Sequence, residues 1–190
     1  MYKLYLDCSG SILTTIVAKD NQVLASFSGS AIQRQTELAV ETINNLLIKV
    51  KISLKQIDQV IVTIGPGSYT GIRVGISFVK TLAVLNPKVK IFTINTLLLQ
   101  AGLKKVVSVL TGYNQKSYLA VYNQGKEIIA PQLVTEVAKQ GIINDLKGFD
   151  LLTDFKTINI IDNFLLLTSK LKQINKLEEL KPLYLSDSFH

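Results

Sequence analysis

A β-branched run that ends in a glycine-rich loop constrains the fold more than any other feature of this sequence. Residues 60–64 read Val-Ile-Val-Thr-Ile, and residues 65–71 read Gly-Pro-Gly-Ser-Tyr-Thr-Gly. β-branched residues favour a strand, and glycines permit the sharp backbone turn from a strand into a helix. A helical pattern then continues to about Leu85 and is closed by Asn86-Pro87. The segment therefore predicts a strand, a tight loop and a helix.

The periodicity on either side extends this unit. Short segments rich in β-branched and aromatic residues, separated by turn residues, predict a meander of three strands, and helical spacing predicts an amphipathic helix before the glycine-rich loop. The expected strands are 2–7, 14–18, 23–27, 59–64 and 90–94, and the expected helices are 32–50, the loop helix to about 85, and 96–103. This order indicates a mixed sheet with helices packed on it.

The second half of the chain is less regular. We expect strands at 106–110, 117–122 and 127–129, and helices near 135–143 and 162–172. The sequence thus predicts an N-terminal lobe, residues 1–103, which carries the glycine-rich loop, and a smaller C-terminal lobe, residues 104–190.

Composition excludes several classes of protein. Cys8 is the single cysteine and His190 the single histidine, so the chain can form no disulfide framework and no histidine-rich zinc site. With no apolar run near the roughly 20 residues that a membrane helix needs, we expect no membrane segment and a cytoplasmic location. The net charge of +7 fits either a solvated lysine-rich surface or contact with RNA.

The glycine-rich loop has two interpretations. Ser68 and Thr70 are good N-cap residues, so the following helix could present free N–H groups to an anion such as a nucleotide phosphate. Asp7, at the end of the first strand, could face a metal-bound phosphate or cap a turn. The candidate nucleotide-binding residues are Gly65, Gly67, Ser68, Thr70 and Asp7. The alternative is a tight turn without a ligand.

The helix after the loop is also open to two interpretations. Gly71 and Gly75 lie four residues apart and so share one helix face. This low-relief face fits close packing either on the chain's own sheet or against a helix of another subunit. Arg73 could pair with a phosphate, with a partner carboxylate, or within the chain. Cys8, with no base beside it, is expected to be a buried thiol.

Four segments resemble the TsaB (YeaZ) family. Residues 65–75, Gly-Pro-Gly-Ser-Tyr-Thr-Gly-Ile-Arg-Val-Gly, closely resemble that family's G-P-G-S-F-T-G-x-R-x-G signature. Asp7-Cys8-Ser9, Ile94-Asn95-Thr96-Leu97 and Pro182-Leu183-Tyr184-Leu185 are similar to its other motifs and stand in the family order. The resemblance implies an actin-like ATPase (ASKHA) fold of two ribonuclease-H-like lobes with the second lobe reduced, related to the catalytic subunit TsaD.

The resemblance also implies a function without catalysis. TsaB acts as a scaffold that binds and activates TsaD, in the complex that makes threonylcarbamoyladenosine in tRNA with the ATPase TsaE. It implies no intrinsic cofactor or metal, ATP or ADP at most at the complex interface, and tRNA reached through the complex. An exposed docking face would also allow a homodimer when the chain is alone, and the sequence leaves this open. The implied docking residues are Glu37, Glu41, Asn44, Ile72, Arg73, Gly75, Ile76 and Val79.

Departures from the family pattern keep other functions open. Residues 111–118, Thr-Gly-Tyr-Asn-Gln-Lys-Ser-Tyr, retain only the last tyrosine of the family's acidic stretch. An ATP-dependent kinase or hydrolase of the same fold is the alternative, which Asp7 and the loop favour. A metal-dependent glycopeptidase is the third hypothesis, and the lack of histidine ligands opposes it.

Overall fold

The computed structural model describes residues 1–30 and 35–185 and divides them into two compact units. Unit 1 consists of residues 1–94 and 171–182, and unit 2 consists of residues 95–170 and the segment from residue 183. Among the described residues, no helix combines the length and the apolarity required to cross a bilayer.

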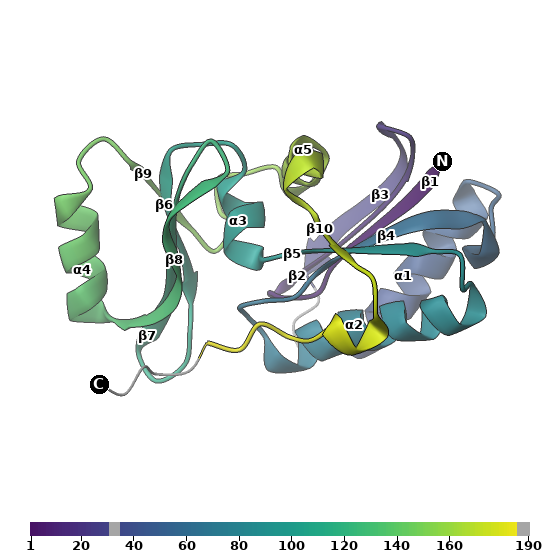
Figure 1. The fold of residues 1–190 in the computed structure, drawn as a ribbon, viewed down its shortest axis with the longest axis horizontal. Coiled ribbons are helices and arrows are strands. Elements are labelled where there is room, and N and C mark those ends of the chain that lie inside the picture. Colours follow the sequence, from purple (N-terminus) through teal and green to yellow (C-terminus); the bar gives the residue numbers. More distant parts are fainter. Residues whose placement is uncertain (31–34, 186–190) are drawn as a thin grey trace. The chain divides into compact units, whose positions relative to one another are not determined.

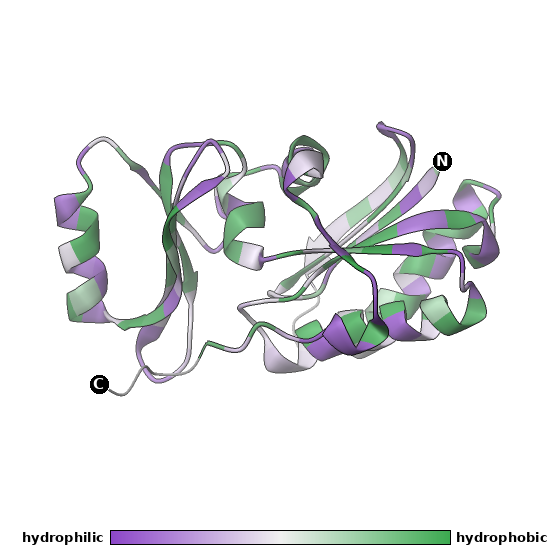
Figure 2. Cartoon of the chain, in the orientation of Figure 1, coloured by the Kyte–Doolittle hydropathy of each residue, from purple (hydrophilic) through white to green (hydrophobic). Residues whose placement is uncertain are grey.

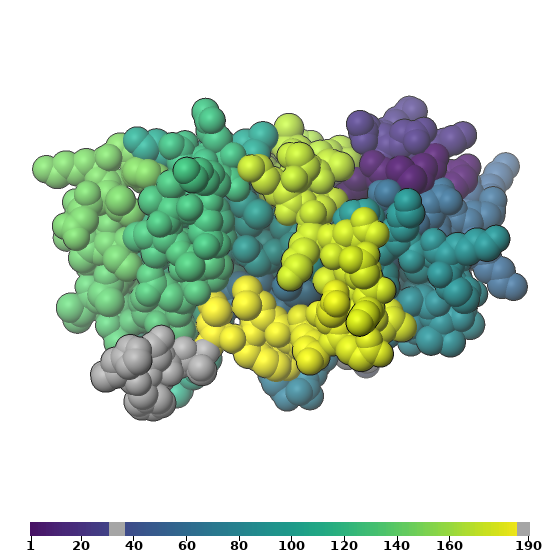
Figure 3. Space-filling view, in the orientation of Figure 1, coloured from purple at the N-terminus to yellow at the C-terminus, as the bar shows by residue number. Residues whose placement is uncertain are grey.

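Unit 1 is built on a six-stranded mixed sheet of order β10-β5-β4-β1-β2-β3 (Figure 1). Its strands are β1 (Tyr2–Asp7), β2 (Ile12–Lys19), β3 (Gln22–Ser30), β4 (Ile57–Thr63), β5 (Lys90–Ile94) and β10 (Lys172–Ile174). β1, β2 and β3 form the predicted antiparallel meander, while β4 runs parallel to β1 and β5 runs parallel to β4. Figure 3 shows residues 171–182, in yellow, on the surface of this unit.

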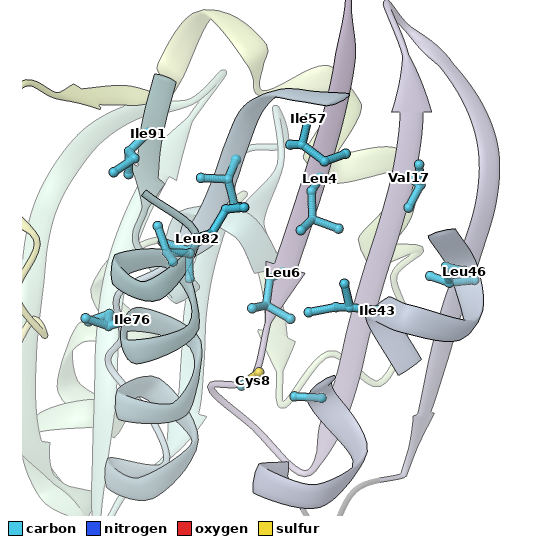
Figure 4. Close-up of a cluster of buried hydrophobic side chains, with 14 of the residues drawn as sticks. Leu4, Leu6, Cys8, Val17, Ile43, Leu46, Ile57, Ile76, Leu82 and Ile91 are labelled. Carbon is cyan, nitrogen blue, oxygen red and sulfur yellow. The ribbon is translucent and has the colours of Figure 1, made fainter. Parts of the chain in front are cut away.

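Two helices of unit 1, α1 (Gln35–Lys49) and α2 (Tyr69–Leu85), contribute to its apolar core. Leu4 and Leu6 of β1 belong to the same buried cluster as Ile43 of α1 and Ile76 of α2 (Figure 4). Along both helices, hydrophobic residues recur between hydrophilic ones, as an amphipathic pattern requires (Figure 2). The predicted start of the first helix, residues 32–34, lies outside the described residues.

Unit 2 contains a four-stranded sheet of order β8-β7-β6-β9. Its elements are α3 (Thr96–Ala101), β6 (Val106–Thr111), β7 (Lys116–Asn123), β8 (Lys126–Thr135), α4 (Glu136–Asp145), β9 (Asp150–Thr153) and α5 (Ile160–Leu166). Gln100 joins three of these elements, because its buried Nε2 donates to Ser108 Oγ at 2.8 Å and to the carbonyl oxygens of Val109 and Leu152 at 3.0 and 3.1 Å.

The structure corrects the sequence-based helix at 162–172. α5 ends at Leu166, a 3₁₀ turn follows at Thr168–Lys170, and residues 172–174 form β10. β10 pairs antiparallel with β5 and so belongs to the sheet of unit 1. The spacing of apolar residues in this segment fits a helix, because over so few residues a short buried strand and a short helix give the same hydrophobic pattern.

Candidate functional site

The glycine-rich loop connects β4 to α2 and is tied to the turn after β1. Ser68 is the N-cap of α2, and its Oγ accepts a hydrogen bond from the Gly71 N–H at 3.2 Å. The Ser68 N–H in turn donates to the carbonyl oxygen of Ser9 at 2.7 Å. The peptide bond between Gly65 and Pro66 is cis. Part of the capping potential of this helix is therefore already satisfied within the chain.

The glycines of the loop and of α2 are required by close approach of the protein's own backbone. A Cβ atom at Gly67 would overlap the Ser9 carbonyl oxygen, and one at Gly71 would overlap the Cys8 carbonyl oxygen. At Gly75 a Cβ would lie 3.2 Å from a methyl group of Val62 in β4. Of the two interpretations of the Gly71 and Gly75 face, the structure therefore shows packing on the chain's own sheet.

Asp7 is buried at the end of β1 and is held by two neighbouring residues. Its Oδ1 accepts hydrogen bonds from the Ser9 N–H at 2.9 Å, from Ser9 Oγ at 2.6 Å and from Thr63 Oγ1 at 2.6 Å. Burial raises the pKa of Asp7, and these hydrogen bonds oppose the rise. Asp7 thus links the ends of β1 and β4.

Cys8, the next residue, is buried as predicted. Its pKa is raised mainly by burial and further by the charge of Asp7. The thiol is therefore held in its protonated form, which is a poor nucleophile.

The residues of this loop do not fit a nucleotide phosphate. In a phosphate-binding loop, glycines leave room for the anion and backbone N–H groups point at it. Here the space beside Gly67 and Gly71 is taken by carbonyl oxygens, whose partial negative charge repels a phosphate. The backbone of Cys8 and Ser9, directly after β1, closes the turn that holds Gly67, Ser68 and Gly71. The assignment of Gly65, Gly67, Ser68, Thr70 and Asp7 to a nucleotide site stays a prediction.

No group of three or more histidine, cysteine, aspartate or glutamate side chains in residues 1–30 and 37–185 is arranged to hold a metal ion.

The predicted docking residues divide between the two faces of unit 1's helices. Ile72, Gly75, Ile76 and Val79 are buried against the sheet, with at most 5% of the surface of the three large side chains exposed. This corrects their assignment to a docking surface, since the folded chain covers them with its own core. Glu37, Glu41 and Asn44 of α1 and Arg73 of α2 are exposed, as docking residues must be.

The outer face of α2 borders an apolar groove that the sequence reasoning did not identify. We call it the helix groove; its volume is about 750 Å³, and α1, α2 and the 3₁₀ turn Leu54–Gln56 contribute to it. It is lined by Val40, Leu54, Tyr69, Thr70, Arg73, Val74, Ser77, Phe78, Thr81, Leu82 and Leu85. The guanidinium of Arg73 lies 4.1 Å from the centre of the Tyr69 ring, so a stacked cation borders the groove.

Large apolar side chains stay exposed along this groove. Val40, Tyr69 and Leu85 expose 55%, 56% and 59% of their surface. For α2 a sequence signal exists, because the helix carries apolar residues beyond its buried set, among them Val74, Phe78 and Leu85, which flank the buried face. An apolar stripe that is wider than the chain's own core covers leaves surface for a partner.

Comparison with known proteins places this architecture in a family. Residues 11–160 match the family model of TsaD, described as tRNA N6-adenosine threonylcarbamoyltransferase. Protein MG208 of Mycoplasma genitalium is 30% identical over 98% of this chain and 95% of its own length. The tRNA threonylcarbamoyladenosine biosynthesis protein TsaB of Bacillus subtilis is 29% identical over 42% of this chain and 35% of its own length.

Among solved structures, YeaZ from Pseudomonas aeruginosa shares the fold, with a TM-score of 0.72 and 17% identity over 97% of this chain and 99% of YeaZ. The predicted α/β fold class is confirmed. The chain therefore belongs to the TsaD family of proteins. Its glycine-rich signature resembles that of the TsaB (YeaZ) members, and its fold matches that of YeaZ.

Proposed function

We propose that this chain is a noncatalytic accessory subunit of a threonylcarbamoyltransferase complex, which binds and activates a TsaD catalytic subunit through the helix groove. Its relatives from Bacillus subtilis and Buchnera aphidicola carry the name tRNA threonylcarbamoyladenosine biosynthesis protein TsaB. The proposal places the chain in the cytoplasm, with the ATPase TsaE and tRNA joining through the complex.

The observation that carries this proposal is the exposure of apolar side chains along the helix groove. Val40, Tyr69 and Leu85 each leave more than half of their surface in water in the isolated chain. Burying apolar surface contributes about 25 cal/mol per Å² removed from water, so a contiguous apolar groove favours association. A groove between two helices fits an apolar helix face of a partner.

The charges beside the groove would orient that partner. Glu37, Glu41 and Asn44 occupy one exposed stripe of α1, next to Val40 at helical spacing. Arg73 stands on α2. A partner helix whose charges complement an acidic stripe on α1 and a cation on α2 would bind in one orientation.

The closed glycine-rich loop supports a role without phosphate chemistry. Because carbonyl oxygens of Cys8 and Ser9 occupy the positions next to Gly71 and Gly67, the loop serves to pack α2 onto β1. The helix groove then presents a rigidly supported surface. This supports the scaffold function over an ATP-dependent kinase or hydrolase.

The test is binding of this chain to TsaD of the same organism, measured by isothermal titration calorimetry. Val40→Asp places a carboxylate in the groove, and Val137→Asp is the matched control because Val137 is an 84% exposed valine on α4 of unit 2. Disruption of a central apolar contact costs about 2 kcal/mol or more, so we expect Val40→Asp to weaken binding roughly 30-fold.

Val137→Asp should bind as the unmodified chain does. If the unmodified chain does not bind TsaD, or if the two variants weaken binding equally, the helix groove is not the docking surface. If light scattering instead shows that Val40→Asp abolishes a homodimer and leaves TsaD binding intact, a second copy of the chain occupies the groove and the proposal is wrong.

A further inference from the structure

Five exposed lysines lie at one edge of unit 1's sheet. Lys49 ends α1, and Lys51 and Lys55 follow it before β4 begins. Lys88 and Lys90 lie where α2 connects to β5. Because β4 and β5 are parallel neighbours, both start at the same edge, and the two connections meet there (Figure 1). We call these five residues the lysine edge.

Hydrogen bonds hold the two connections against each other. The side-chain amide of Asn86, which caps the end of α2, donates to the Ile57 carbonyl oxygen at 2.9 Å and to the Lys55 carbonyl oxygen at 3.4 Å. Lys90 pairs with Gln59 in the register of β4 and β5. Neighbouring strands lie about 4.8 Å apart, so two lysine-bearing segments more than thirty residues apart in the sequence lie side by side here.

Apolar residues that alternate with the lysines pack on the core, which leaves the lysine side chains exposed to solvent. Val50, Ile52 and Leu54 pack against the apolar core of unit 1, and Lys49, Lys51 and Lys55 alternate with them and stay exposed. Val89 packs in the same way between Lys88 and Lys90. The Lys-Val-Lys triplet thus occurs twice, at 49–51 and 88–90, with each valine as the anchor.

The positive charge of this edge is not neutralised within the described chain. None of the five lysines forms an ion pair with a carboxylate among the described residues. The nearest carboxylate in the sequence, Asp58, accepts a hydrogen bond from the Tyr2 N–H at 2.6 Å and offsets at most one of the five positive charges. The neighbouring turn after β10 adds no net charge, since Lys176 and Lys181 are offset by Glu178 and Glu179.

Compensation of the helix dipole does not account for the cluster. A cation in the last turn of a helix is stabilising. Lys49 meets that condition, but the other four lysines lie beyond the ends of α1 and α2. A row of lysines at one sheet edge is instead complementary in charge to a polyanion. Lysine contacts phosphates as a point charge, and such contacts do not depend on the base sequence.

We infer that the lysine edge binds the sugar-phosphate backbone of RNA. The inference rests on the proposed function, in which tRNA is the substrate of the complex, and it adds a direct contact between this chain and that RNA. The helix groove and the lysine edge are separate sets of residues, so one surface can hold the protein partner while the other holds the nucleic acid.

The test is fluorescence anisotropy of a labelled tRNA transcript titrated with the full chain, at potassium chloride concentrations from 50 to 200 mM. The edge variant combines Lys49→Gln, Lys51→Gln, Lys55→Gln, Lys88→Gln and Lys90→Gln. The control variant replaces five exposed lysines of unit 2 with glutamine: Lys104, Lys126, Lys147, Lys156 and Lys170. Each variant removes five charges from the net +7, so the two proteins have the same charge of +2.

Contacts to four phosphates give a slope of about −3.6 in a plot of log K against log salt, which is a weakening of roughly 150-fold over this fourfold range. We expect that slope from the unmodified chain and a slope near zero from the edge variant, with binding at 50 mM salt at least tenfold weaker. The control variant should keep most of the slope. Circular dichroism checks that both variants are folded.

Two results overturn the inference: no binding of the unmodified chain at 50 mM salt, or an equal loss in both variants. If the fivefold edge variant is unfolded, Lys49→Gln/Lys51→Gln and Lys88→Gln/Lys90→Gln are tested separately, and each should reduce the slope by about 1.8. TsaD binding by the edge variant separates this inference from the proposed function, because loss of RNA binding with TsaD binding intact leaves the scaffold function standing.

Discussion

Replacing each helix glycine by alanine tests whether α2 packs on β1 as the structure shows. Gly71 and Gly75 lie four residues apart on the same face of α2, yet an added methyl group would meet different neighbours. At Gly71 it would overlap the carbonyl oxygen of Cys8, which belongs to the backbone of a buried segment. At Gly75 it would lie 3.2 Å from Val62 Cγ2, a side-chain atom that can shift by a few tenths of an ångström.

The expected free energies follow from two opposing terms. Alanine gains up to about 1 kcal/mol over glycine in a helix. Overpacking costs about 1 to 3 kcal/mol, and a clash with backbone falls at the upper end because backbone cannot rotate away. Gly71→Ala should therefore lower the free energy of unfolding by about 2 kcal/mol. Gly75→Ala should leave it nearly unchanged.

Urea unfolding at 25 °C, followed by circular dichroism, measures both variants against the unmodified chain. A loss of 2 kcal/mol corresponds to a melting temperature lower by about 4 to 8 °C for a chain of this length. If the two variants differ by less than about 0.5 kcal/mol, or if Gly75→Ala is the more damaging, the contact between α2 and the Cys8 carbonyl does not hold and the reasoning is refuted.

Two further perturbations address buried polar groups. Gln100→Leu removes an amide whose two N–H groups serve three acceptors, together with the acceptor of the Phe155 N–H. Urea unfolding should therefore show a loss of about 3 kcal/mol or more, whereas Gln140→Leu on the exposed part of α4 should show almost none. Equal effects would contradict a structural role for Gln100. Asp7→Asn keeps the Oδ1 acceptor but removes the charge. Burial raises the pKa of Asp7 above that of an unfolded carboxyl group. The unmodified chain should therefore lose stability as the pH rises through the folded pKa, and the variant should not. Urea unfolding of both proteins between pH 4 and 8 is the measurement, and a variant that becomes less stable than the unmodified chain at higher pH would contradict the prediction.

The first half of the fold could be predicted from sequence because its signals are local. The β-branched run before the glycine-rich loop places β4 within two residues of its observed bounds, and the closing Asn86-Pro87 places the end of α2 at Leu85. The start of α2 was predicted too late, since the helix begins at Tyr69, inside the expected loop. β10 could not be predicted, since its three residues are a strand only because β5 offers them an unpaired edge. β9 was missed for a similar reason, as its four residues pair with β6 of unit 2. The division of the chain at residue 103 stays a prediction.

The candidate site was predicted only in part. Helical spacing identifies which residues of α2 share a face but not which face meets the sheet, so Ile76 and Val79 were placed outside although they lie in the core. The glycine motif was correctly seen as a close approach, while the approaching group, the backbone of Cys8 and Ser9, comes from a segment some sixty residues earlier in the sequence. Side-chain alternation cannot reveal such a contact between distant segments.

The pairing of β10 with β5 has a consequence for the order in which the chain can fold. Thr93 Oγ1 of β5 contacts the carbonyl oxygen of Lys172 across 79 positions of sequence, and all of unit 2 up to Lys170 lies between them. While a ribosome makes those intervening residues, β5 of the nascent chain presents an open backbone edge, which is prone to pair with other chains. Residues 95–170 of unit 2 are thus inserted between two segments of unit 1. The first sheet to be started is completed only after residues 172–174 have emerged.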